Sequence, residues 1–345
     1  MGPEERAAVD KVLQSGIIAQ GPEVAKFEEE FAKICGVKYA IATNNGTTSG
    51  HLAMLANGIG PGDEVITTPF TFFATASVIM MAGAKPVFVD VEENGFCLDP
   101  KKAESAVTSK TKAIQPVHLY GELADMPSFL DICKKHNLVL IEDSAQAHNA
   151  DSWNGKAGSF GDVGWFSFYP TKNMTTSEGG IITTNNEKIA NLCKVLRAHG
   201  MTAQYQHTKF GYNYRMTDIS AAIGRVQLGK LSNFNTRRRE IANIYNNKLS
   251  NYVDVPENRR GHVFHQYTIL CNQRNELRDY LNEKGVGSGI YYPTLLYDYE
   301  PMAEFVSSCP NAKRLTEMAL SLPVHPALSD SDVSRVIESV ISFFD

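Results

Sequence analysis

Apolar and polar positions along the chain follow two alternating patterns. Short runs with strand-like composition occur at 38–43, 63–68, 85–91, 111–117, 138–143, 163–168 and 179–184. Between them lie segments of helical periodicity, at 48–58, 73–83 and 126–137. Strands that alternate with helices are typical of α/β units. We therefore predict an α/β fold with a mostly parallel central sheet flanked by helices.

The two ends of the chain differ from this alternating region. Two short helices are expected first, with Pro3 and Pro22 at their first turns and Gly16 and Gly36 after their ends. Helical patterns return at 218–231 and 237–249 and are followed by a strand, a helix, a loop and a final helix from Asp330. We predict a large domain, residues 1–240, and a smaller α+β C-terminal domain, residues 241–345.

Composition excludes several classes of protein. The 345 residues are 43% hydrophobic and 21% charged, with a net charge of −5, which argues against a nucleic-acid binder. No apolar run approaches the roughly 18 residues of a membrane span, and the first 13 residues contain no signal-peptide core. Six cysteines without a CxxC pair fit reduced thiols and a cytoplasmic location. Cys133 and His136 have metal-like spacing but no second pair, so we expect no metal site.

Candidate ligand-binding residues follow the strands, because ligands of open α/β sheets bind beyond the carboxyl ends of the strands. Thr47 and Thr48 open a helix after the first strand. Such a turn can bind a phosphate at the helix N-terminus, or it can be a plain helix cap. Phe72, after the next strand, can form a flat wall of a pocket or pack in the core. Both alternatives are open for each position.

Two charged residues occupy unusual surroundings. Asp143 ends an apolar strand, where a carboxylate is costly to bury unless it meets a cation or caps a helix. Gln146 follows it within reach. Lys172 is the only basic residue of the aromatic, small and hydroxyl-bearing segment "FSFYPTKNMTTSEGG", five residues after Ser167. A surface lysine would ordinarily have more polar neighbours.

Taken together, these residues describe one ligand. Thr47, Thr48 and Ser167 suit a phosphate, and Phe72 suits a flat ring. Asp143 suits a basic ring nitrogen, and Lys172 suits an aldehyde that forms a Schiff base with it. Pyridoxal 5′-phosphate (PLP) has all four groups, and a lysine imine with an acidic partner at the ring nitrogen is its recurring environment.

The sequence also resembles a known family from end to end. The motifs are "GPEVAKFEEEFA", "NNGTTSGHLAM", "GPGDEVITTPFTFFAT", "GAKPVFVDV", "PVHLYG", "IEDSAQAH", "GDVGWFSFYPTKNMTTSEGG", "GYNYRMTDISAAIGRVQL" and "SLPVHPAL". In this order they are similar to the DegT/DnrJ/EryC1/StrS family of PLP-dependent nucleotide-sugar aminotransferases. That family has the fold type I architecture of the aspartate aminotransferase superfamily.

The resemblance implies a role for each matching residue. It implies that Lys172 forms the imine, that Asp143 contacts the ring nitrogen and that Gln146 lies beside the ring hydroxyl. It also implies that Asn213 reaches the PLP phosphate of a neighbouring subunit in a homodimer with shared active sites. The expected reaction moves an amino group from an amino acid, usually glutamate, to a nucleotide-linked keto-sugar. The product is an amino sugar for surface polysaccharide, glycan or antibiotic biosynthesis. Some relatives carry histidine in place of the lysine and are dehydratases, so a lysine favours transamination.

The substrate is less clearly indicated. The segment "TKNMTTSEGG" resembles members that act on 4-keto-6-deoxy sugars more than it resembles the 3-keto branch. Tyr291 stands where the family often has a histidine, and Arg215, Tyr292 and His325 are candidate substrate contacts or structural residues. Arg237, Arg238 and Arg239 could meet a diphosphate, but consecutive residues point around a helix, which favours a solvated face. A PLP-dependent sugar dehydratase and a non-catalytic nucleotide-sugar sensor are the alternative functions.

Overall fold

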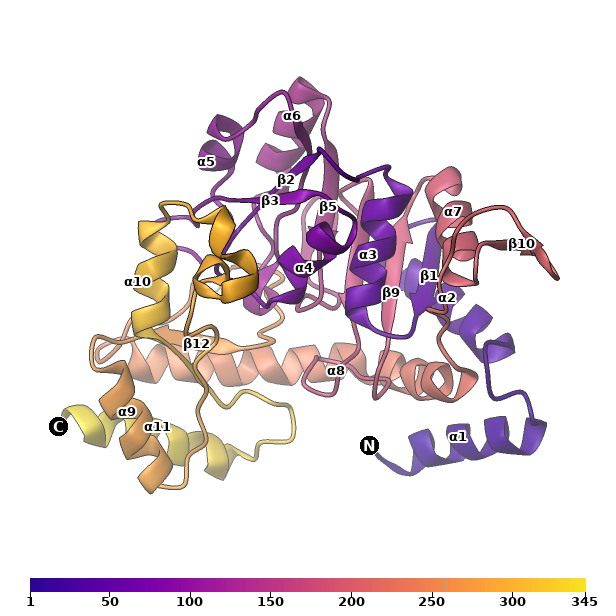
Figure 1. Cartoon of the computed structure of the whole chain (residues 1–345). Coiled ribbons are helices and arrows are strands. Elements are labelled where there is room, and N and C mark those ends of the chain that lie inside the picture. The colour runs from indigo at the N-terminus through magenta and orange to yellow at the C-terminus, as the bar shows by residue number, and fades with distance from the viewer. Residues whose placement is uncertain (258) are drawn as a thin grey trace.

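A seven-stranded sheet forms the centre of the computed structural model, which describes residues 1–257 and 259–345 (Figure 1). Strand β9 is antiparallel to both neighbours, and the other six strands run in one direction. This confirms the predicted α/β fold with a mostly parallel sheet. In spatial order the strands are β1 (Tyr39–Thr43), β9 (Gly180–Thr184), β8 (Val163–Ser167), β5 (Val139–Asp143), β4 (Thr111–Ile114), β2 (Glu64–Thr67) and β3 (Lys85–Phe88).

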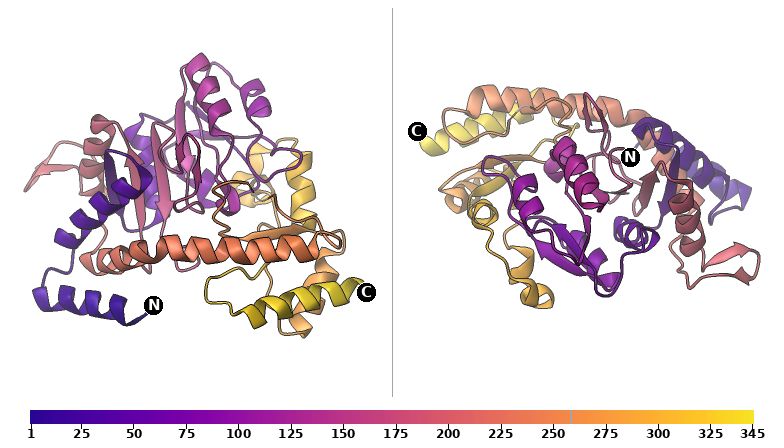
Figure 2. Two further views of the ribbon diagram at one scale, coloured as in Figure 1. Left: turned by 180° about the vertical axis from the view of Figure 1, so that it is seen from behind. Right: turned by 90° about the horizontal axis from the view of Figure 1, so that it is seen from above.

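Helices cover both faces of this sheet because neighbouring strand residues point to opposite sides. On one face, Ile41 and Trp165 pack with α3 (Gly46–Ala56), α4 (Ala74–Met81) and α7 (Glu187–Arg197). On the other face, Phe166 packs with α2 (Pro22–Cys35) and α8 (Asp218–Leu249), while α6 (Met126–His136) covers β4 and β5 and contacts α5 (Pro100–Ser105). Figure 2 shows these layers from behind and from above.

The expected N-terminal helices are present. They are α1 (Pro3–Ser15) and α2, each with proline in its first turn and each followed by a left-handed glycine, Gly16 or Gly36. The two expected helical segments after residue 217 form one continuous helix, α8, of 32 residues. The first half of α8 packs against α1 and α2, and its second half enters the C-terminal core through Ile241 and Tyr245. The domain boundary at residue 240 stays a prediction, and it falls inside this helix.

The C-terminal part is a smaller α+β layer. Its strands β12 (Tyr267–Leu270) and β13 (Ala319–Leu322) pair antiparallel and pack with α9 (Arg274–Glu283) and α11 (Asp330–Phe344). The segment between α9 and α10 (Pro310–Met318) returns to the large sheet, where the Leu296 amide donates to the Pro69 carbonyl. It contains the short helices η2 (Leu296–Asp298) and η3 (Glu300–Phe305). This return brings Tyr291 and Tyr292 to the carboxyl ends of the strands.

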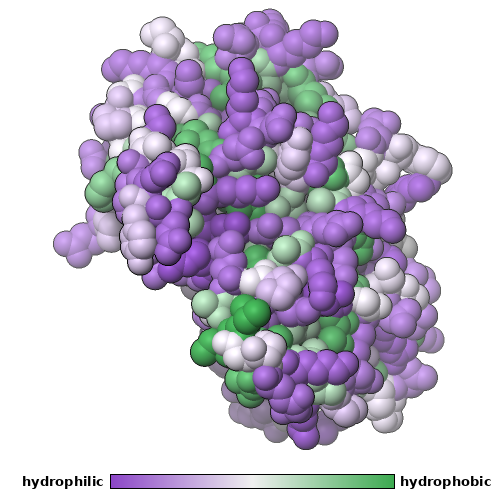
Figure 3. All heavy atoms as spheres, turned by 90° about the vertical axis from the view of Figure 1, so that its right-hand side faces the viewer, coloured by the Kyte–Doolittle hydropathy of each residue, from purple (hydrophilic) through white to green (hydrophobic). Residues whose placement is uncertain are grey.

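Small elements complete the fold. They are the hairpins β6 (Asp151–Ser152) with β7 (Gly155–Lys156) and β10 (Met201–Ala203) with β11 (Gln206–His207), and the single turn η1 (Leu119–Gly121). The β10–β11 hairpin projects from the side shown in Figure 3, where apolar patches lie between hydrophilic side chains. Among the described residues, no helix is both long and apolar enough to cross a membrane. All six cysteines are free and buried.

Candidate active site

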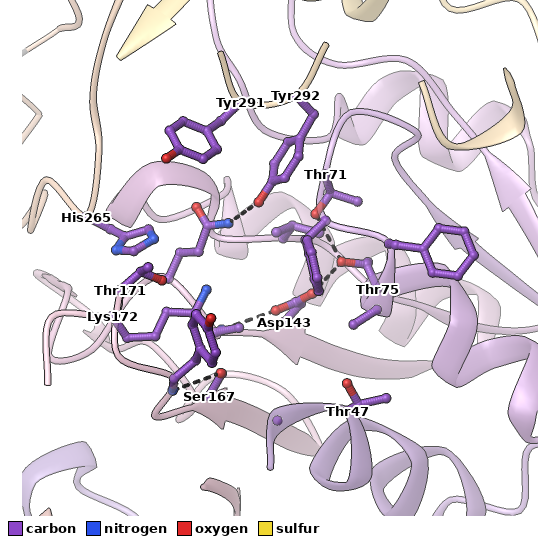
Figure 4. A pocket seen from close by; sticks show the side chains of 18 of the residues that line it. Thr47, Thr71, Thr75, Asp143, Ser167, Thr171, Lys172, His265, Tyr291 and Tyr292 are labelled. Carbon is purple, nitrogen blue, oxygen red and sulfur yellow. Dashed lines mark hydrogen bonds between the residues drawn. The ribbon is translucent and has the colours of Figure 1, made fainter. Parts of the chain in front are cut away.

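A cavity of about 990 Å³ lies beyond the carboxyl ends of the parallel strands (Figure 4). The N-terminus of α3, the loop after β8 and the returning segment around Tyr292 enclose it. The structure brings together eight of the residues that we expect at the site, and all eight line this cavity: Thr47, Thr48, Phe72, Asp143, Gln146, Ser167, Lys172 and Tyr292.

The N-terminus of α3 forms one end of the cavity. Asn45 is its N-cap, and the Asn45 side chain accepts a hydrogen bond from the Thr48 amide at 2.9 Å. A side chain at Gly46 would place its Cβ 2.7 Å from the Cβ of Ser167, so glycine allows the helix to approach β8 closely. The helix end therefore brings Thr47 and Ser167 to one wall of the cavity. Its positive dipole favours an anion there.

Asp143 lies at the end of β5 and is 3% exposed. Its carboxylate accepts hydrogen bonds from the Thr75 hydroxyl at 2.7 Å and from the Ala145 amide at 3.1 Å. Burial raises the pKa of Asp143 to about 6, although these two donors and the charge of Lys172 act in the opposite direction. Turns follow β5 at residues 144–150, so Asp143 does not cap a helix there. It offers a carboxylate that a cationic ring nitrogen would stabilise.

Lys172 lies on the turn after β8, where its backbone amide donates to the Tyr169 carbonyl at 2.9 Å. The protein that encloses its amine lowers the pKa of Lys172 to about 8, while attraction by Asp143 opposes this shift. An amine with this pKa is neutral in a far larger fraction of molecules at pH 7 than an ordinary lysine. Neutral amines attack aldehydes, so this environment favours a nucleophile and base.

Gln146 ties the sheet to the returning segment. Its Oε1 atom accepts a hydrogen bond from the Tyr120 amide at 2.9 Å, and its Nε2 atom donates to the Tyr292 hydroxyl at 2.8 Å. The Tyr120 hydroxyl in turn donates to the Tyr291 carbonyl. Hydrogen bonds thus link Tyr291 and Tyr292 to Tyr120 and Gln146.

Phe72 lines the cavity with 56% of its surface exposed, whereas Phe70 is fully buried. Core packing is therefore wrong for Phe72, and the wall of a pocket is its observed position. Its ring lies 6.3 Å from the ring of Tyr292, measured between centroids. An exposed ring at this place can stack on a flat ligand.

Three expected residues lie outside this cavity. Asn213 is exposed and pairs with Ala198 at the end of α7, and Arg215 pairs with Thr43 at the end of β1. His325 lines a neighbouring cavity of about 510 Å³, which shares Gln266 and Tyr291 with the first.

The solvated face expected for the three consecutive arginines is wrong for Arg238. Arg237 is partly exposed and pairs with Asp330. Arg238 is 6% exposed and donates to the carbonyls of Phe264 and His265, because α8 packs against this segment.

Several residues at the site are not among those expected from the sequence. Thr71, Thr75, Tyr120, His265 and Gln266 also line the cavity. Thr71 and Thr75 are four residues apart, and their hydroxyls lie 3.0 Å apart at the start of α4. Two hydroxyl residues four positions apart, at the predicted start of a helix, could have been identified from the sequence as neighbours at the site.

Glu142 supports the site from the opposite face of β5. Both of its side-chain oxygens are fully buried. One accepts from the amides of Phe160 and Gly161, each at 2.8 Å. The other accepts from the Gly158 amide at 2.8 Å and lies 3.0 Å from the His118 Nε2 atom. The His118 Nδ1 atom accepts from the Ala124 amide, so Nε2 is its donor. Four donors thus fix the carboxylate immediately before Asp143.

The donor set fits PLP. A carboxylate and an amine lie in one cavity with an exposed aromatic ring, and a helix N-terminus with two hydroxyl side chains forms one end. The volume is within the range of pockets for small ligands, about 300–1,000 Å³. Thr47, Thr48 and Ser167 would hold the phosphate, Phe72 the ring, Asp143 the ring nitrogen and Lys172 the aldehyde carbon.

Curated relatives match almost the whole chain. The chain is 42% identical to a pleiotropic regulatory protein of Geobacillus stearothermophilus, and the match covers 99% of this chain and 95% of that protein. It is 40% identical to GDP-perosamine synthase of Caulobacter vibrioides, with coverages of 98% and 95%. It is also 40% identical to dTDP-3-amino-3,6-dideoxy-alpha-D-galactopyranose transaminase of Aneurinibacillus thermoaerophilus, with coverages of 98% and 94%.

Solved structures and a family model agree with these relatives. DesV of S. venezuelae, solved in complex with a ketimine intermediate, superimposes with a TM-score of 0.96 at 35% identity. That match covers 99% of this chain and 94% of DesV. The family model for the DegT/DnrJ/EryC1/StrS aminotransferases matches residues 1–341. The chain therefore belongs to the DegT/DnrJ/EryC1/StrS aminotransferase family.

Proposed function

We propose that this protein is a PLP-dependent aminotransferase that moves an amino group from an amino acid to the keto group of a nucleotide-linked sugar. One observation carries the proposal: Lys172 and Asp143 line the same cavity, with pKa values of about 8 and about 6. Each pKa lies close to neutral pH, where an amine can exchange a proton and a carboxylate can hold a cation.

The residues of the chain divide the work. PLP supplies an aldehyde that captures amines and a protonated ring that accepts electrons. Asp143 would keep the proton on the ring nitrogen, and the Thr75 hydroxyl favours the ionised form of Asp143 by donating to it. Lys172 would take the proton from the donor α-carbon and deliver it to the cofactor carbon that bears the amine, and in the second half-reaction it would move a proton in the reverse direction. Its pKa of about 8 suits both directions.

For the substrate, we propose a 4-keto-6-deoxy sugar as acceptor and glutamate as donor. The resemblance of the segment 171–180 to members with that preference supports the acceptor. A 3-keto sugar is the main alternative, because three relatives are named as a 3-aminotransferase or as transaminases of 3-amino sugars. We place the reaction in the cytoplasm, which the six free and buried thiols support.

A half-reaction assay tests this function. The protein is loaded with pyridoxamine 5′-phosphate and mixed with 4-keto-6-deoxy hexoses linked to dTDP, GDP and UDP, and with their 3-keto counterparts. Return of the aldehyde absorbance with a 4-keto sugar is the expected result. Return with a 3-keto sugar alone would move the specificity to the other branch. Elimination of water without transfer would indicate a dehydratase, and tight binding without reaction would indicate a sensor.

We also propose a homodimer in which each active site uses Asn213 of the neighbouring subunit. Asn213 lies outside its own cavity and on the surface, which leaves its amide free to reach another chain. Tyr205 and Phe210, 83% and 84% exposed, lie on the same projecting segment, where a second copy would cover them. The family resemblance supports the same assignment.

A further inference from the structure

His265 is a histidine of the active-site cavity that has no role in the function proposed above. It lies just before β12, is 5% exposed and lines the cavity. Figure 4 shows its imidazole on the same side of the pocket as Lys172 and Tyr291. The Arg238 guanidinium donates to the carbonyls of Phe264 and His265, which fixes the backbone that carries the ring.

A chain of buried amides determines which ring nitrogen of His265 carries the hydrogen. The Asn235 Nδ2 atom donates to the His148 carbonyl at 2.9 Å, so Asn235 Oδ1 is the acceptor that receives Asn173 Nδ2 at 2.9 Å. Asn173 Nδ2 also donates to the Val263 carbonyl at 3.0 Å. The remaining Asn173 oxygen lies 3.3 Å from His265 Nδ1 and can only accept. His265 Nδ1 therefore donates, and Nε2 carries a lone pair.

The imidazole is also kept neutral. Burial lowers the pKa of His265 well below its usual value, and the positive charges of Lys172 and Arg238 act in the same direction. A neutral ring with hydrogen on Nδ1 can only accept a hydrogen bond at Nε2. The ring is thus a fixed acceptor at the wall of the cavity beside Lys172.

This acceptor discriminates between the two proposed substrates. The α-amino group of an amino-acid donor is engaged at the cofactor aldehyde, and its carboxylates present oxygens without hydrogen, which a lone pair repels. The hydroxyl groups of a hexose can donate. We infer that His265 Nε2 accepts a hydrogen bond from a hydroxyl group of the sugar substrate, with Asn173 as the positioning residue that fixes the tautomer. This inference rests on the proposed function, since it requires a sugar in the cavity.

Measuring the two half-reactions separately tests this role, because the sugar takes part only in the second. A residue that both half-reactions need would affect both rates. The test variant is His265→Leu, which has no acceptor. In the second variant, His265→Gln, the amide oxygen can accept, so it should retain more of the sugar half-reaction than His265→Leu. The matched control is His148→Leu, because His148 is buried between Phe166 and Phe168 and does not line the cavity. Stopped-flow absorbance follows the PLP form with glutamate and the pyridoxamine form with dTDP-linked and GDP-linked 4-keto-6-deoxy hexoses.

We expect His265→Leu to slow the sugar half-reaction about tenfold to a hundredfold, the range for a buried hydroxyl left without its partner. The glutamate half-reaction should stay within about twofold, and this also shows that the variant folds and binds PLP. An equal loss of rate in both half-reactions would overturn the inference, because His265 would then act on Lys172, which both half-reactions use. No loss in either would also overturn it.

Two further results keep the inference separate from the proposed function. If the parent protein reacts with glutamate but with no keto-sugar, the proposed acceptor is wrong and the inference falls with it. If the parent reacts with sugar and His265→Leu reacts equally well, only the inference is wrong. Long-range ¹H–¹⁵N NMR of the parent protein should show the hydrogen of His265 on Nδ1, and hydrogen on Nε2 would contradict the assignment.

Discussion

Replacing Thr75 with valine removes the hydroxyl that donates to Asp143 at 2.7 Å and nearly preserves side-chain volume. Hydrogen bonds to charged groups contribute about 1.5–3 kcal/mol, and one pKa unit corresponds to about 1.4 kcal/mol. The pKa of Asp143, about 6 in the parent, should therefore rise by about 1–2 units, because the ionised form loses a donor. At pH 7, the ionised fraction should fall from about 90% to between about 50% and 10%.

The assay measures how strongly the protein without cofactor binds 4-deoxypyridoxine 5′-phosphate, a ligand with the phosphate and ring nitrogen of PLP but no aldehyde. Lys172 cannot react with it, and the titrations of Lys172 and of the ligand are common to both proteins, so the difference between the pH profiles of the parent and Thr75→Val reports on Asp143. Affinity should rise with pH as Asp143 ionises, with a midpoint near 6 in the parent and about 1–2 units higher in Thr75→Val. The two proteins should bind almost equally above about pH 9 and differ about twofold to tenfold at pH 7.

Thr71→Val is the matched control for this experiment. It removes a hydroxyl 3.0 Å from that of Thr75 and leaves the contact between Thr75 and Asp143 in place. Its midpoint should lie closer to that of the parent. A Thr75→Val midpoint equal to that of the parent would refute the reasoning, because Asp143 would then not be the group that ionises as the ligand binds.

Three further predictions concern other parts of the site. The rate at which the protein captures PLP should rise about tenfold per pH unit and level off near pH 8, the pKa of Lys172; a stopped-flow rate that still climbs at pH 10 would contradict this. Glu142→Gln should lower the free energy of unfolding by about 2–4 kcal/mol, because an amide NH₂ would face buried donors; urea denaturation within 0.5 kcal/mol of the parent, on the order of an exposed polar change, would argue against the network. Lys172→Ala and Asn213→Ala chains, each poorly active, should recover activity toward half per heterodimer when mixed, and no recovery despite subunit exchange would place Asn213 in its own site.

The sheet could be predicted from the sequence because most positions in its strands are buried and many of them carry apolar side chains. β8 and β9 are examples: nearly every residue in them is buried, so the pattern needs no knowledge of their neighbours. The short helix α5 has six residues, fewer than two turns, and gives no periodic signal. Helix α7 does carry an apolar face through Ile189, Cys193 and Leu196, yet it is absent from the elements that we expected.

Site residues could be predicted where they directly follow a strand and their unusual surroundings are visible in the adjacent sequence. Asp143 stands out because it ends an apolar strand, and Lys172 because it is the only basic residue of the segment that follows a strand. His265 gives no such signal, because its tautomer depends on Asn173, which is 92 positions away in the sequence. Arg238 is similar: only the packing of α8 against the segment before β12 makes one of three consecutive arginines a buried donor.

Reductive trapping tests the central claim, that the Lys172 amine is the group that binds the cofactor aldehyde. The PLP-loaded protein is treated with borohydride, digested and mapped by mass spectrometry, with Lys172→Ala as the control. The account predicts a stable pyridoxyl group on Lys172 in the parent and none in the control, which should still bind the cofactor through the other contacts. A pyridoxyl group on a different lysine of the parent would contradict the account.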